Sequence, residues 1–530
     1  MIKKIKIQNY KLFQLFTLDF NSDLNILVGN NEVGKSTILE AINLALTKKI
    51  NGRFAETELS PYLFNKECVN DYLSNIYKGG NPDLPKIIIE LYFSEIEGTE
   101  ILIGNNNSER EDCPGVKVEI TFDEDYRDDY SKLLENRAEI KMIPTEYYKI
   151  YWHSFANKSV APRSFPVNTS FIDATSIRLQ SGTDYYLQNI INSGLEAREK
   201  VALAITYRSL KEKFSDEPSI KGINDKLTER KGVITDKDLA ISIDISQKAN
   251  WETNLVPHLD GIPFQLAGQG EQNALKIMLA LERQADKSDV ILIEEPENHL
   301  SFSSMNKLIS KIKNRCGGKQ IFITTHSAYV LNKLGIDKLI FIYNNNKAFL
   351  RNLPIDTQNY FKKLSGYDTL RLILANKSIL VEGPSDELLI QKAYIMKYGK
   401  LPIEDGVDVI NVRGLSFTRF LDIAKELGKD VVVVTDNDHD YQKNVIEKYE
   451  AYIGTGRIKV CSSDDNKLNT LEPNIVACND IAVLNKIFGT KKDKKALVQY
   501  MENNKTDCAL KIFESEESIN MPDYVNDAIS

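Results

Sequence analysis

The spacing of apolar residues predicts strands and helices in alternation along most of the chain. In the first fifty residues, "KKIKIQNY" (3–10) alternates as a strand does, "LNILVG" (24–29) is a short apolar strand, and "KSTILEAINLAL" (35–46) has the apolar spacing of a helix. Further segments with strand patterns lie at 86–93, 116–122 and 146–152. We expect these later strands to form an antiparallel lobe.

The middle of the chain changes from a helical pattern to a second alternation. Residues 183–230 are polar and helical in pattern, and two strand-like segments follow, "DLAISIDI" (238–245) and "IPFQLAG" (262–268). Helices and strands then alternate at 272–285, 289–294, 303–315 and 320–324, and again from 377 to 488, before a helical tail. The pattern is interrupted between 345 and 376, so we expect an α/β multidomain protein with a boundary there.

The composition adds few constraints on function. The chain has 530 residues, 42% of them hydrophobic and 27% charged, as in soluble globular proteins with several domains. No run approaches the ~18 apolar residues of a membrane span, the N-terminus lacks a signal-peptide core, and the six cysteines have no C-x-x-C spacing. A net charge of −8 argues against a wholly basic DNA-coating protein but not against local basic grooves. We expect a cytoplasmic protein without membrane association.

One loop matches a phosphate-binding motif at every fixed position. "GNNEVGKS" (29–36) has the form G-x-x-x-x-G-K-[ST], and it follows an apolar strand and opens a helix. In such a loop the backbone N–H groups and the helix dipole hold the phosphates, Lys35 reaches the β- and γ-phosphates, and the Ser36 hydroxyl binds Mg²⁺. The residues expected to contact the nucleotide here are Gly29, Asn30, Asn31, Gly34, Lys35, Ser36 and Thr37.

Acidic residues that a phosphate-binding loop requires occur about 260 residues later. The apolar strand of "DVILIEEPENHLS" ends in Glu294 and Glu295. We expect Glu294 to hold the Mg²⁺ shell and Glu295 to polarise the attacking water. In "QIFITTHS", His326 stands at the end of the next strand, where a γ-phosphate sensor belongs.

These elements resemble the ABC-type ATPase head of the SMC/RecF group. The resemblance extends to the opening "IKKIKIQNYKLFQ" and to "LAGQGEQNALKIMLALE" (266–282), which stands at the place of the signature motif. It implies that Gly268 and Gly270 contact the ATP of an opposite subunit. The chain departs from the group in having Ala267 for the usual serine, Glu294 for the usual aspartate, and no glutamine between Gln14 and Gln180 to form a Q-loop. We therefore expect ATP binding with slow hydrolysis.

A second set of carboxylates follows buried strands near the C-terminal end. "SILVEGPSDELLIQKAY" (378–394) predicts strand, turn and helix, with Glu382 at the strand end and Asp386 in the first helical turn, facing one point. In "KDVVVVTDNDHD", four valines suit a central parallel strand, which opens into Asp436, Asp438 and Asp440. Such a cluster is electrostatically unfavourable unless cations neutralise it.

This pattern resembles the TOPRIM domain, in which the first glutamate and the Asp-x-Asp pair bind divalent metal; here these are Glu382, Asp436 and Asp438. An ATPase head followed by a TOPRIM domain is the arrangement of OLD (overcoming lysogenization defect) family endonucleases. That resemblance implies a further metal-binding glutamate, Glu472 in "NTLEPNIV", and a catalytic lysine in "NNKTDCALKIFE", Lys505 in preference to Lys511. Asp386 stands where the family often has glutamate. Its shorter side chain is expected to change the metal preference or to weaken the second metal site.

The resemblance implies a Mg²⁺- or Mn²⁺-dependent DNA endonuclease that nicks or cuts both strands, with two ions at the TOPRIM site and one with ATP. It also implies a homodimer or larger even-numbered oligomer and a role in anti-phage defence that acts on phage or plasmid DNA. The resemblance further implies a partner encoded beside the protein, such as a helicase-like protein or a retron reverse transcriptase with its DNA–RNA element. The expected domains are an ATPase head (1–174 and 236–350), a helical dimerisation insert (175–235), a Rossmann-like TOPRIM domain (376–488) and a helical C-terminal segment (489–530).

Two other functions fit part of the pattern. An SMC/RecF-like ATPase that clamps DNA without cutting it explains the head, but it leaves the carboxylates unused, and no sustained heptad repeat supplies the long arms of such clamps. A topoisomerase needs a tyrosine nucleophile and a bacterial primase needs a zinc ribbon, and the sequence identifies neither.

Overall fold

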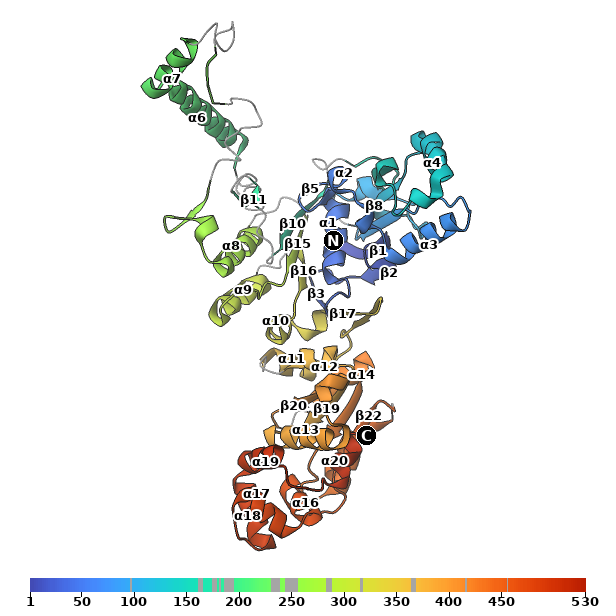
Figure 1. Cartoon of the computed structure of the whole chain (residues 1–530), viewed down its shortest axis with the longest axis vertical. Helices are drawn as coiled ribbons and strands as arrows, with labels where there is room; N and C mark the ends of the chain where they lie inside the picture. Colours follow the sequence, from blue (N-terminus) through green and yellow to red (C-terminus); the bar gives the residue numbers. More distant parts are fainter. Residues whose placement is uncertain are drawn as a thin grey trace. The chain divides into compact units, whose positions relative to one another are not determined.

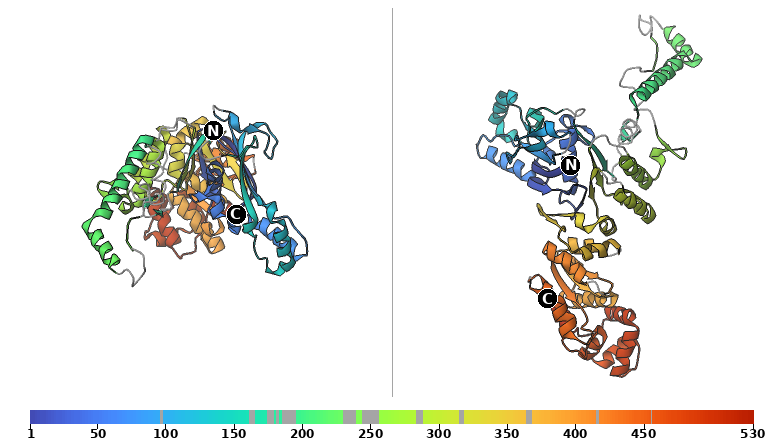
Figure 2. Two further views of the ribbon diagram at one scale, coloured as in Figure 1. Left: turned by 90° about the horizontal axis from the view of Figure 1, so that it is seen from above. Right: turned by 180° about the vertical axis from the view of Figure 1, so that it is seen from behind.

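The computed structural model consists of two compact units. The first comprises Met1–Leu24 and Ser36–Thr324, and the second comprises Asn25–Lys35 and Thr325–Ser530. The structure describes residues 1–95, 98–160, 165–173, 179–180, 183–184, 195–229, 239–243, 256–282, 288–314, 318–363, 368–414, 417–454 and 456–530. Figures 1 and 2 show their elements, coloured along the sequence. None of the described helices combines the length and the apolar character that a membrane crossing requires.

An antiparallel sheet forms one part of the first unit. Its strands follow the order β2-β1-β6-β8-β7, with β9 paired to β8. Alternate side chains, such as those of Ile5, Ile7 and Ile89, are fully buried, which accounts for the alternation in the sequence. The strands are β1 (Ile2–Tyr10), β2 (Phe13–Asp19), β6 (Ile87–Phe93), β7 (Ile103–Gly104), β8 (Cys113–Phe122) and β9 (Tyr148–Ser154). The predicted antiparallel lobe is confirmed.

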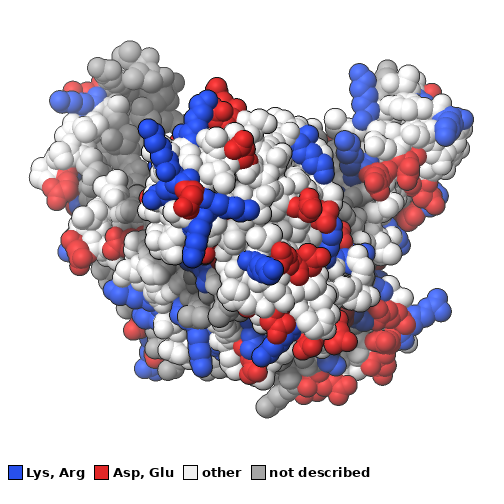
Figure 3. Space-filling model, turned by 90° about the horizontal axis from the view of Figure 1, so that it is seen from below, with Lys and Arg blue, Asp and Glu red and all other residues white. Residues whose placement is uncertain are grey.

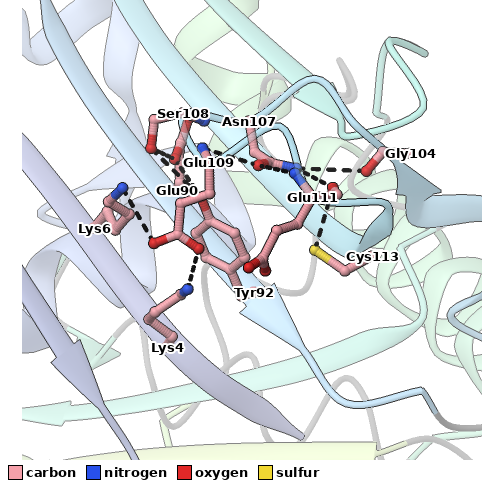
Figure 4. Close-up of polar contacts among 10 residues, drawn as sticks. All are labelled: Lys4, Lys6, Glu90, Tyr92, Gly104, Asn107, Ser108, Glu109, Glu111 and Cys113. Carbon is pink, nitrogen blue, oxygen red and sulfur yellow. Dashed lines mark hydrogen bonds and ion pairs between the residues drawn. The ribbon is translucent and has the colours of Figure 1, made fainter.

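A buried carboxylate fixes the polar loop between β7 and β8 on this sheet (Figure 4). Glu90 of β6 is 2% exposed. Its Oε1 accepts from the Ser108 N–H at 2.9 Å, and its Oε2 accepts from the Ser108 hydroxyl at 2.7 Å and the Tyr92 hydroxyl at 2.8 Å. Nearby, Glu109 pairs with Lys4, and this hydrogen bond lowers the pKa of Glu109. Both oxygens of the buried carboxylate are therefore satisfied, as burial requires.

Parallel strands carry the residues expected to bind nucleotide. In the first unit β10, β15 and β16 pair in parallel, and in the second unit β3 pairs in parallel with β17, which pairs with β18. β3 and β16 are buried along their whole length, as parallel strands usually are. The bounds are β3 (Leu24–Val28), α1 (Lys35–Thr47), β10 (Val167–Asp173), α8 (Gln269–Glu282), β15 (Ser288–Glu294), α9 (Phe302–Asn314), β16 (Lys319–Thr324), β17 (Leu339–Tyr343) and β18 (Asn346–Phe349).

Of the two strands predicted between these elements, one is wrong in its described part and the other is shorter than predicted. In the segment predicted at 238–245, the described residues 239–243 form no strand, because the backbone of Ile241 bonds to the Asn224 side chain instead of to a neighbouring strand. The segment at 262–268 forms only the short strand β14 (Ile262–Pro263) before a 3₁₀ turn, Phe264–Leu266.

Two helices occupy the described part of the predicted helical insert. They are α6 (Ala197–Asp216) and α7 (Pro218–Thr228), drawn in green in Figure 1. The remainder of the predicted insert falls largely outside the described residues.

The second unit contains a four-stranded parallel sheet in the order β20-β19-β21-β22. Strands and helices alternate through it, and Figures 1 and 2 show α13 beside the sheet and the C-terminal helices beyond. The strands are β19 (Lys377–Val381), β20 (Val407–Asn411), β21 (Asp430–Val434) and β22 (Ile458–Cys461). The helices are α11 (Ile355–Lys363), α12 (Thr369–Leu374), α13 (Pro384–Tyr398), α14 (Phe417–Leu427), α15 (Lys448–Ile453), α16 (Leu471–Cys478), α17 (Ile481–Phe488), α18 (Lys494–Asn503), α19 (Lys505–Glu514) and α20 (Asp523–Ala528). The predicted second αβ alternation and helical tail are confirmed.

Candidate functional site

The phosphate-loop motif connects β3 to α1. A Cβ atom on Gly29 would lie 2.4 Å from the carbonyl oxygen of Ile342 in β17, so only glycine fits there. Gly34 adopts a φ of 98°, which also favours glycine. The Lys35 ammonium is buried and donates to the carbonyl oxygens of Gly29 at 2.9 Å and Asn30 at 2.8 Å. The loop is therefore closed around the ammonium group that a phosphate would attract.

The acidic motif of the first unit lies where β15 ends. Glu294 is the last residue of the strand, and Glu295 follows with a φ of 43°. The Glu295 N–H donates to the carbonyl oxygen of Thr324 at 3.0 Å, and the Asn298 amide donates to Glu295 Oε2 at 2.6 Å. This turn fixes the Glu295 carboxylate on the side of the sheet end where Asn298 lies. His326, in the second unit, is exposed.

A cavity of about 630 Å³ lies at the beginning of α8 in the first unit. A Cβ atom on Gly270 would lie 2.0 Å from the carbonyl oxygen of His299. Only glycine at this position therefore allows α8 to lie so close to the segment that follows Glu295. The predicted signature motif and this segment thus form one surface. The cavity is lined by Gly268, Gln269, Gly270, Glu271, Ala274, His299, Leu300, Ser301 and Ser304.

The parallel sheet of the second unit brings Glu382 and Asp436 together. β19 and β21 are parallel neighbours, so the residues that follow them lie at the same edge of the sheet. Glu382 Oε1 accepts hydrogen bonds from the Thr435 hydroxyl at 2.6 Å and from the Asp436 N–H at 3.1 Å. No described residue donates a hydrogen bond to the second oxygen, Oε2.

Asp386 and Glu472 complete the carboxylates at this edge. Asp386 lies in the first turn of α13, where its carboxylate accepts from the Gly383 N–H at 3.0 Å. Glu472, 4% exposed, lies in the first turn of α16; its Oε1 is 3.4 Å from Lys505 Nζ and its Oε2 accepts from the Thr470 hydroxyl at 2.9 Å.

The two candidate lysines have different surroundings. Lys505 begins α19 and pairs with Glu472, whereas Lys511 donates to the carbonyl oxygen of Phe488 at 3.4 Å. The structure therefore brings Lys505 to the carboxylates and not Lys511.

The Asp-x-Asp segment places its carboxylates differently. Asp436 is half-buried beside Glu382, and Asp438 is exposed, with a φ of 46°. Asp440 accepts from the Lys443 N–H at 3.1 Å and so caps the following helical turn. Asp436 faces the site, Asp438 lies on its rim, and Asp440 has a structural partner.

Negative charge accumulates in this site. Burial, together with the charges of Glu382 and Glu472, raises the pKa of Asp386 to about 7, against the hydrogen bond from Gly383 and the charge of Lys505. Burial, together with the charges of Glu382, Asp386 and Glu472, raises the pKa of Asp436 to about 8. The carboxylates repel one another more strongly than Lys505 compensates.

The donor chemistry of the site suits a hard divalent cation. In the described part of the chain, no three Asp, Glu, His or Cys side chains converge around one point as ligands. The carboxylates of Glu382, Asp386 and Glu472 instead have protein donors, which include Thr435, Gly383 and Lys505. Oxygen ligands of this kind bind Mg²⁺ or Mn²⁺, and a cation would relieve their repulsion.

Sequence reasoning missed three residues of the site. Thr435 donates to Glu382, and the buried Asn437 amide donates to the carbonyl oxygens of Ser463 at 2.8 Å and Asp465 at 3.0 Å, which fixes the Asp-x-Asp loop. Their signal is their position directly after a fully apolar strand. Tyr524 of α20 lies close enough that Asp436 and neighbouring carboxylates, after burial, raise the pKa of its hydroxyl; no pattern in the sequence marked it.

Comparisons with known proteins match both halves of the chain. Residues 1–331 match the AAA ATPase domain, and residues 373–438 match the TOPRIM domain of overcoming lysogenization defect protein-like proteins. The chain is 21% identical over 476 residues to the protein named endonuclease GajA of Bacillus cereus (strain VD045), covering 84% of this chain and 76% of that protein.

Two solved structures align with different parts of the chain. The SMC head domain from Thermotoga maritima covers 66% of this chain and 98% of its own at 12% identity, with a TM-score of 0.29. The C-terminal region of the Burkholderia pseudomallei OLD protein covers 29% of this chain and 96% of its own at 18% identity, with a TM-score of 0.25.

The predicted resemblance to the OLD family is confirmed, and with it the expected class, a nuclease-type hydrolase with an ATP-binding domain. Nucleotide and divalent-metal use are implied by the two domains. Because its first match covers more than half of the chain, the protein belongs to the AAA ATPase domain family, and it carries an OLD-type TOPRIM domain behind the ATPase domain.

Proposed function

We propose that the protein is a DNA endonuclease that hydrolyses phosphodiester bonds at its TOPRIM site under the control of ATP. The proposal rests mainly on the position of Glu382. Two donors hold one of its oxygens, and the other stays available at the edge where Asp386, Asp436 and Glu472 gather. A cluster of this kind is suited to holding cations against a phosphate.

Each carboxylate has a role in the proposed reaction. Two bound Mg²⁺ or Mn²⁺ ions would neutralise the scissile phosphate, activate the attacking water and stabilise the leaving oxygen. Lys505, half-exposed beside Glu472, stabilises charge that develops on the phosphate. Glu382, Asp436 and Asp438 hold the principal ion, and Asp386 and Glu472 contribute to the second.

The ATPase domain regulates this chemistry in the proposal. Lys35 exchanges its carbonyl partners for nucleotide phosphates, Ser36 and Glu294 hold one Mg²⁺ with ATP, and Glu295 orients the attacking water. His326 senses the γ-phosphate. Asn30, Asn31 and Thr37 line the phosphates, and Gly268 and Gly270 face ATP bound to a second copy.

The biological setting is proposed from the relatives. One relative is named an endonuclease and the matched TOPRIM domain is that of lysogenization-defect proteins, which favours defence of a bacterial cytoplasm against phage or plasmid DNA. A homodimer or larger even-numbered assembly, and a partner encoded nearby such as a helicase-like protein or a retron reverse transcriptase, belong to the same proposal.

Tyr524 does not suit the role of the tyrosine nucleophile that the topoisomerase alternative requires. This tyrosine lies near the carboxylates, but burial and their negative charges raise the pKa of its hydroxyl. A phenolate nucleophile is therefore disfavoured at this position. The clamp alternative leaves the carboxylates of the second unit without a role.

The test is cleavage of supercoiled plasmid with Mg²⁺, Mn²⁺ or EDTA, with ATP varied. Asp436→Asn and Glu382→Gln keep the side-chain shape and should reduce cutting by more than about a hundredfold, beyond the usual effect of residues that only support metal ligands. Asp440→Asn is the matched control, because its side chain caps a helical turn and asparagine caps as well. Cleavage that survives Asp436→Asn would overturn the site, and a wild-type protein inert on every DNA form would favour the clamp.

A further inference from the structure

A strongly basic segment lies in the second unit beyond the carboxylate site. Residues 486–495 contain five lysines and one aspartate, a local charge of +4 in a chain whose net charge is −8. Lys491, Lys494 and Lys495 are exposed and Lys492 is half-buried; these four lysines are the basic ridge. Figure 3 shows the face seen from below, where basic side chains form one denser group and others are scattered among acidic side chains.

The backbone of the basic ridge is fixed on both sides. The Asn485 side chain accepts from the Lys492 N–H at 2.9 Å and donates to the Lys492 carbonyl oxygen at 2.8 Å, and it accepts from the Thr490 hydroxyl at 2.6 Å. Asp493 caps α18 by accepting from the Ala496 N–H at 2.8 Å. The lysines therefore project from a defined scaffold and not from a loose charge run.

The charges of the basic ridge are unfavourable for the fold itself. Lys494 and Lys495 occupy the first turn of α18, where the positive end of the helix dipole repels them, and the N-cap Asp493 places one carboxylate beside them. No described residue forms an ion pair with Lys491, Lys494 or Lys495, whereas nearby Lys486 pairs with Glu517 at 2.6 Å. One capping carboxylate offsets the positive charge of four lysines only in part, and such departures from a local rule are typical of functional surfaces.

The basic ridge lies within one turn of a DNA duplex from the catalytic lysine proposed above. Lys495 and Asn503 are eight residues apart on α18, which corresponds to about 12 Å. Lys505 follows two residues after Asn503, so the path from the ridge to Lys505 is roughly 20 Å. One turn of duplex DNA spans about 34 Å.

The side chains beside the basic ridge favour contact with phosphates over contact with bases. The aromatic residues of α17 and α18 are Phe488, which is 4% exposed, and Tyr500, whose ring lies 5.3 Å from the Lys492 ammonium. The Phe488 ring is therefore closed to a stacking base, and the Lys492 ammonium lies over the Tyr500 ring. Lysines alone supply point charges, which bind the backbone without reading sequence.

We propose that the basic ridge binds the sugar–phosphate backbone of duplex DNA beside the cut site and holds the substrate in register with Lys505. This proposal rests on the proposed endonuclease function and adds the surface that recruits the substrate. It assigns the basic ridge to binding and not to the chemical step.

The experiment compares two full-length triple variants with the same loss of charge. Lys491→Ala/Lys494→Ala/Lys495→Ala removes exposed lysines of the ridge, and Lys66→Ala/Lys362→Ala/Lys363→Ala removes exposed lysines elsewhere. Fluorescence anisotropy with a labelled duplex of about one to three turns, in EDTA so that nothing is cut, gives affinity against salt concentration. The ridge variant should bind at least about tenfold more weakly near 0.1 M salt, with a log–log salt slope shallower by about 2 to 3, and the control should match the wild type.

Cleavage kinetics separate this proposal from the function on which it rests. The ridge variant should raise KM for DNA and keep kcat, because the carboxylates are untouched. Unchanged affinity and slope in the ridge variant, or an equal loss in the control, would overturn the proposal while leaving the nuclease intact. A wild type that binds DNA through the ridge but never cuts it would instead overturn the endonuclease function.

Discussion

The hydroxyl of Thr435 lies 2.6 Å from Oε1 of Glu382, and the N–H of the next residue, Asp436, donates to the same oxygen. The strand that delivers one carboxylate thus also orients another from the neighbouring strand. Both donors bond to Oε1, and no described residue donates a hydrogen bond to Oε2. Oε2 is therefore the oxygen of Glu382 that can bind a cation. Thr435 is therefore a positioning residue for the proposed metal ligand.

Removing this hydroxyl should weaken metal use without changing the ligands. Thr435→Val keeps the shape but loses the donor, and we expect cleavage to require about 10- to 100-fold more Mg²⁺. Thr435→Ser keeps the donor and should restore the wild-type requirement. Mg²⁺ titrations of plasmid cleavage measure this; equal Mg²⁺ requirements in the valine and serine variants would assign Thr435 a packing role only.

The metal-free second unit should lose stability as the pH rises. Asp386 and Asp436 have pKa values of about 7 and about 8 in the folded state, above the ordinary value of 3.8. Between pH 4 and pH 8, approximately, the folded protein holds protons that the unfolded chain has released, so the free energy of unfolding decreases over that range.

Thermal unfolding in EDTA from about pH 5 to pH 8 measures this effect. The melting temperature should fall by a few degrees as the pH rises, and Mg²⁺ should restore it at the upper end, where the carboxylates are ionised. Asp436→Asn should flatten the profile. A melting temperature that rises over this range in EDTA, equally in both proteins, would contradict the electrostatic account.

Nucleotide binding should depend on Lys35. Its ammonium is held by the carbonyl oxygens of Gly29 and Asn30, and no other lysine or arginine occurs in the loop. Lys35→Ala should abolish ATP binding in titration calorimetry, whereas Glu295→Gln should bind ATP and not turn it over. With Ala267 in place of serine, wild-type turnover should stay below the typical ~10 s⁻¹. Equal ATP affinity in wild type and Lys35→Ala would refute the assignment.

Assembly should depend on the exposed apolar residues of α6. Val201, Ile205 and Leu210 are 58%, 64% and 63% exposed, which leaves apolar surface suited to a second copy. Light scattering should show a dimer or a larger even-numbered assembly. Val201→Glu/Ile205→Glu should shift it toward monomer at micromolar concentration, while Lys213→Glu, on the same helix, should not. A monomeric wild type, with and without ATP, would exclude this role.

The sequence alone was enough to identify the strand ends that carry the candidate site residues. The apolar strand before Gly29, the four valines before Asp436 and the turn after Glu382 each combine a strand pattern with the residues that follow it. Such signals lie within ten to fifteen neighbouring residues, where steric rules and periodicity act directly. They predicted both αβ regions, and the family comparisons confirmed the two domains. The roles of the individual site residues stay predictions.

Tertiary structure decided what local pattern left open. The segment around Ile241 alternates like a strand, but the Asn224 side chain takes its backbone hydrogen bonds. Asp436 and Asp440 read alike in sequence, yet one faces Glu382 and the other caps a helical turn.

Tertiary structure also decided which residues that are distant in the sequence lie close together. Thr435 meets Glu382 because β19 and β21 are neighbours in the sheet. Lys505 meets Glu472, and Tyr524 lies near the carboxylates, through helices that are far apart in the chain. The pKa values of the site depend on these meetings as well, since burial and neighbouring charge are properties of the folded chain. Periodicity determines which face of an element is apolar, but only packing determines which other element covers that face, and the charges of this site result from that packing.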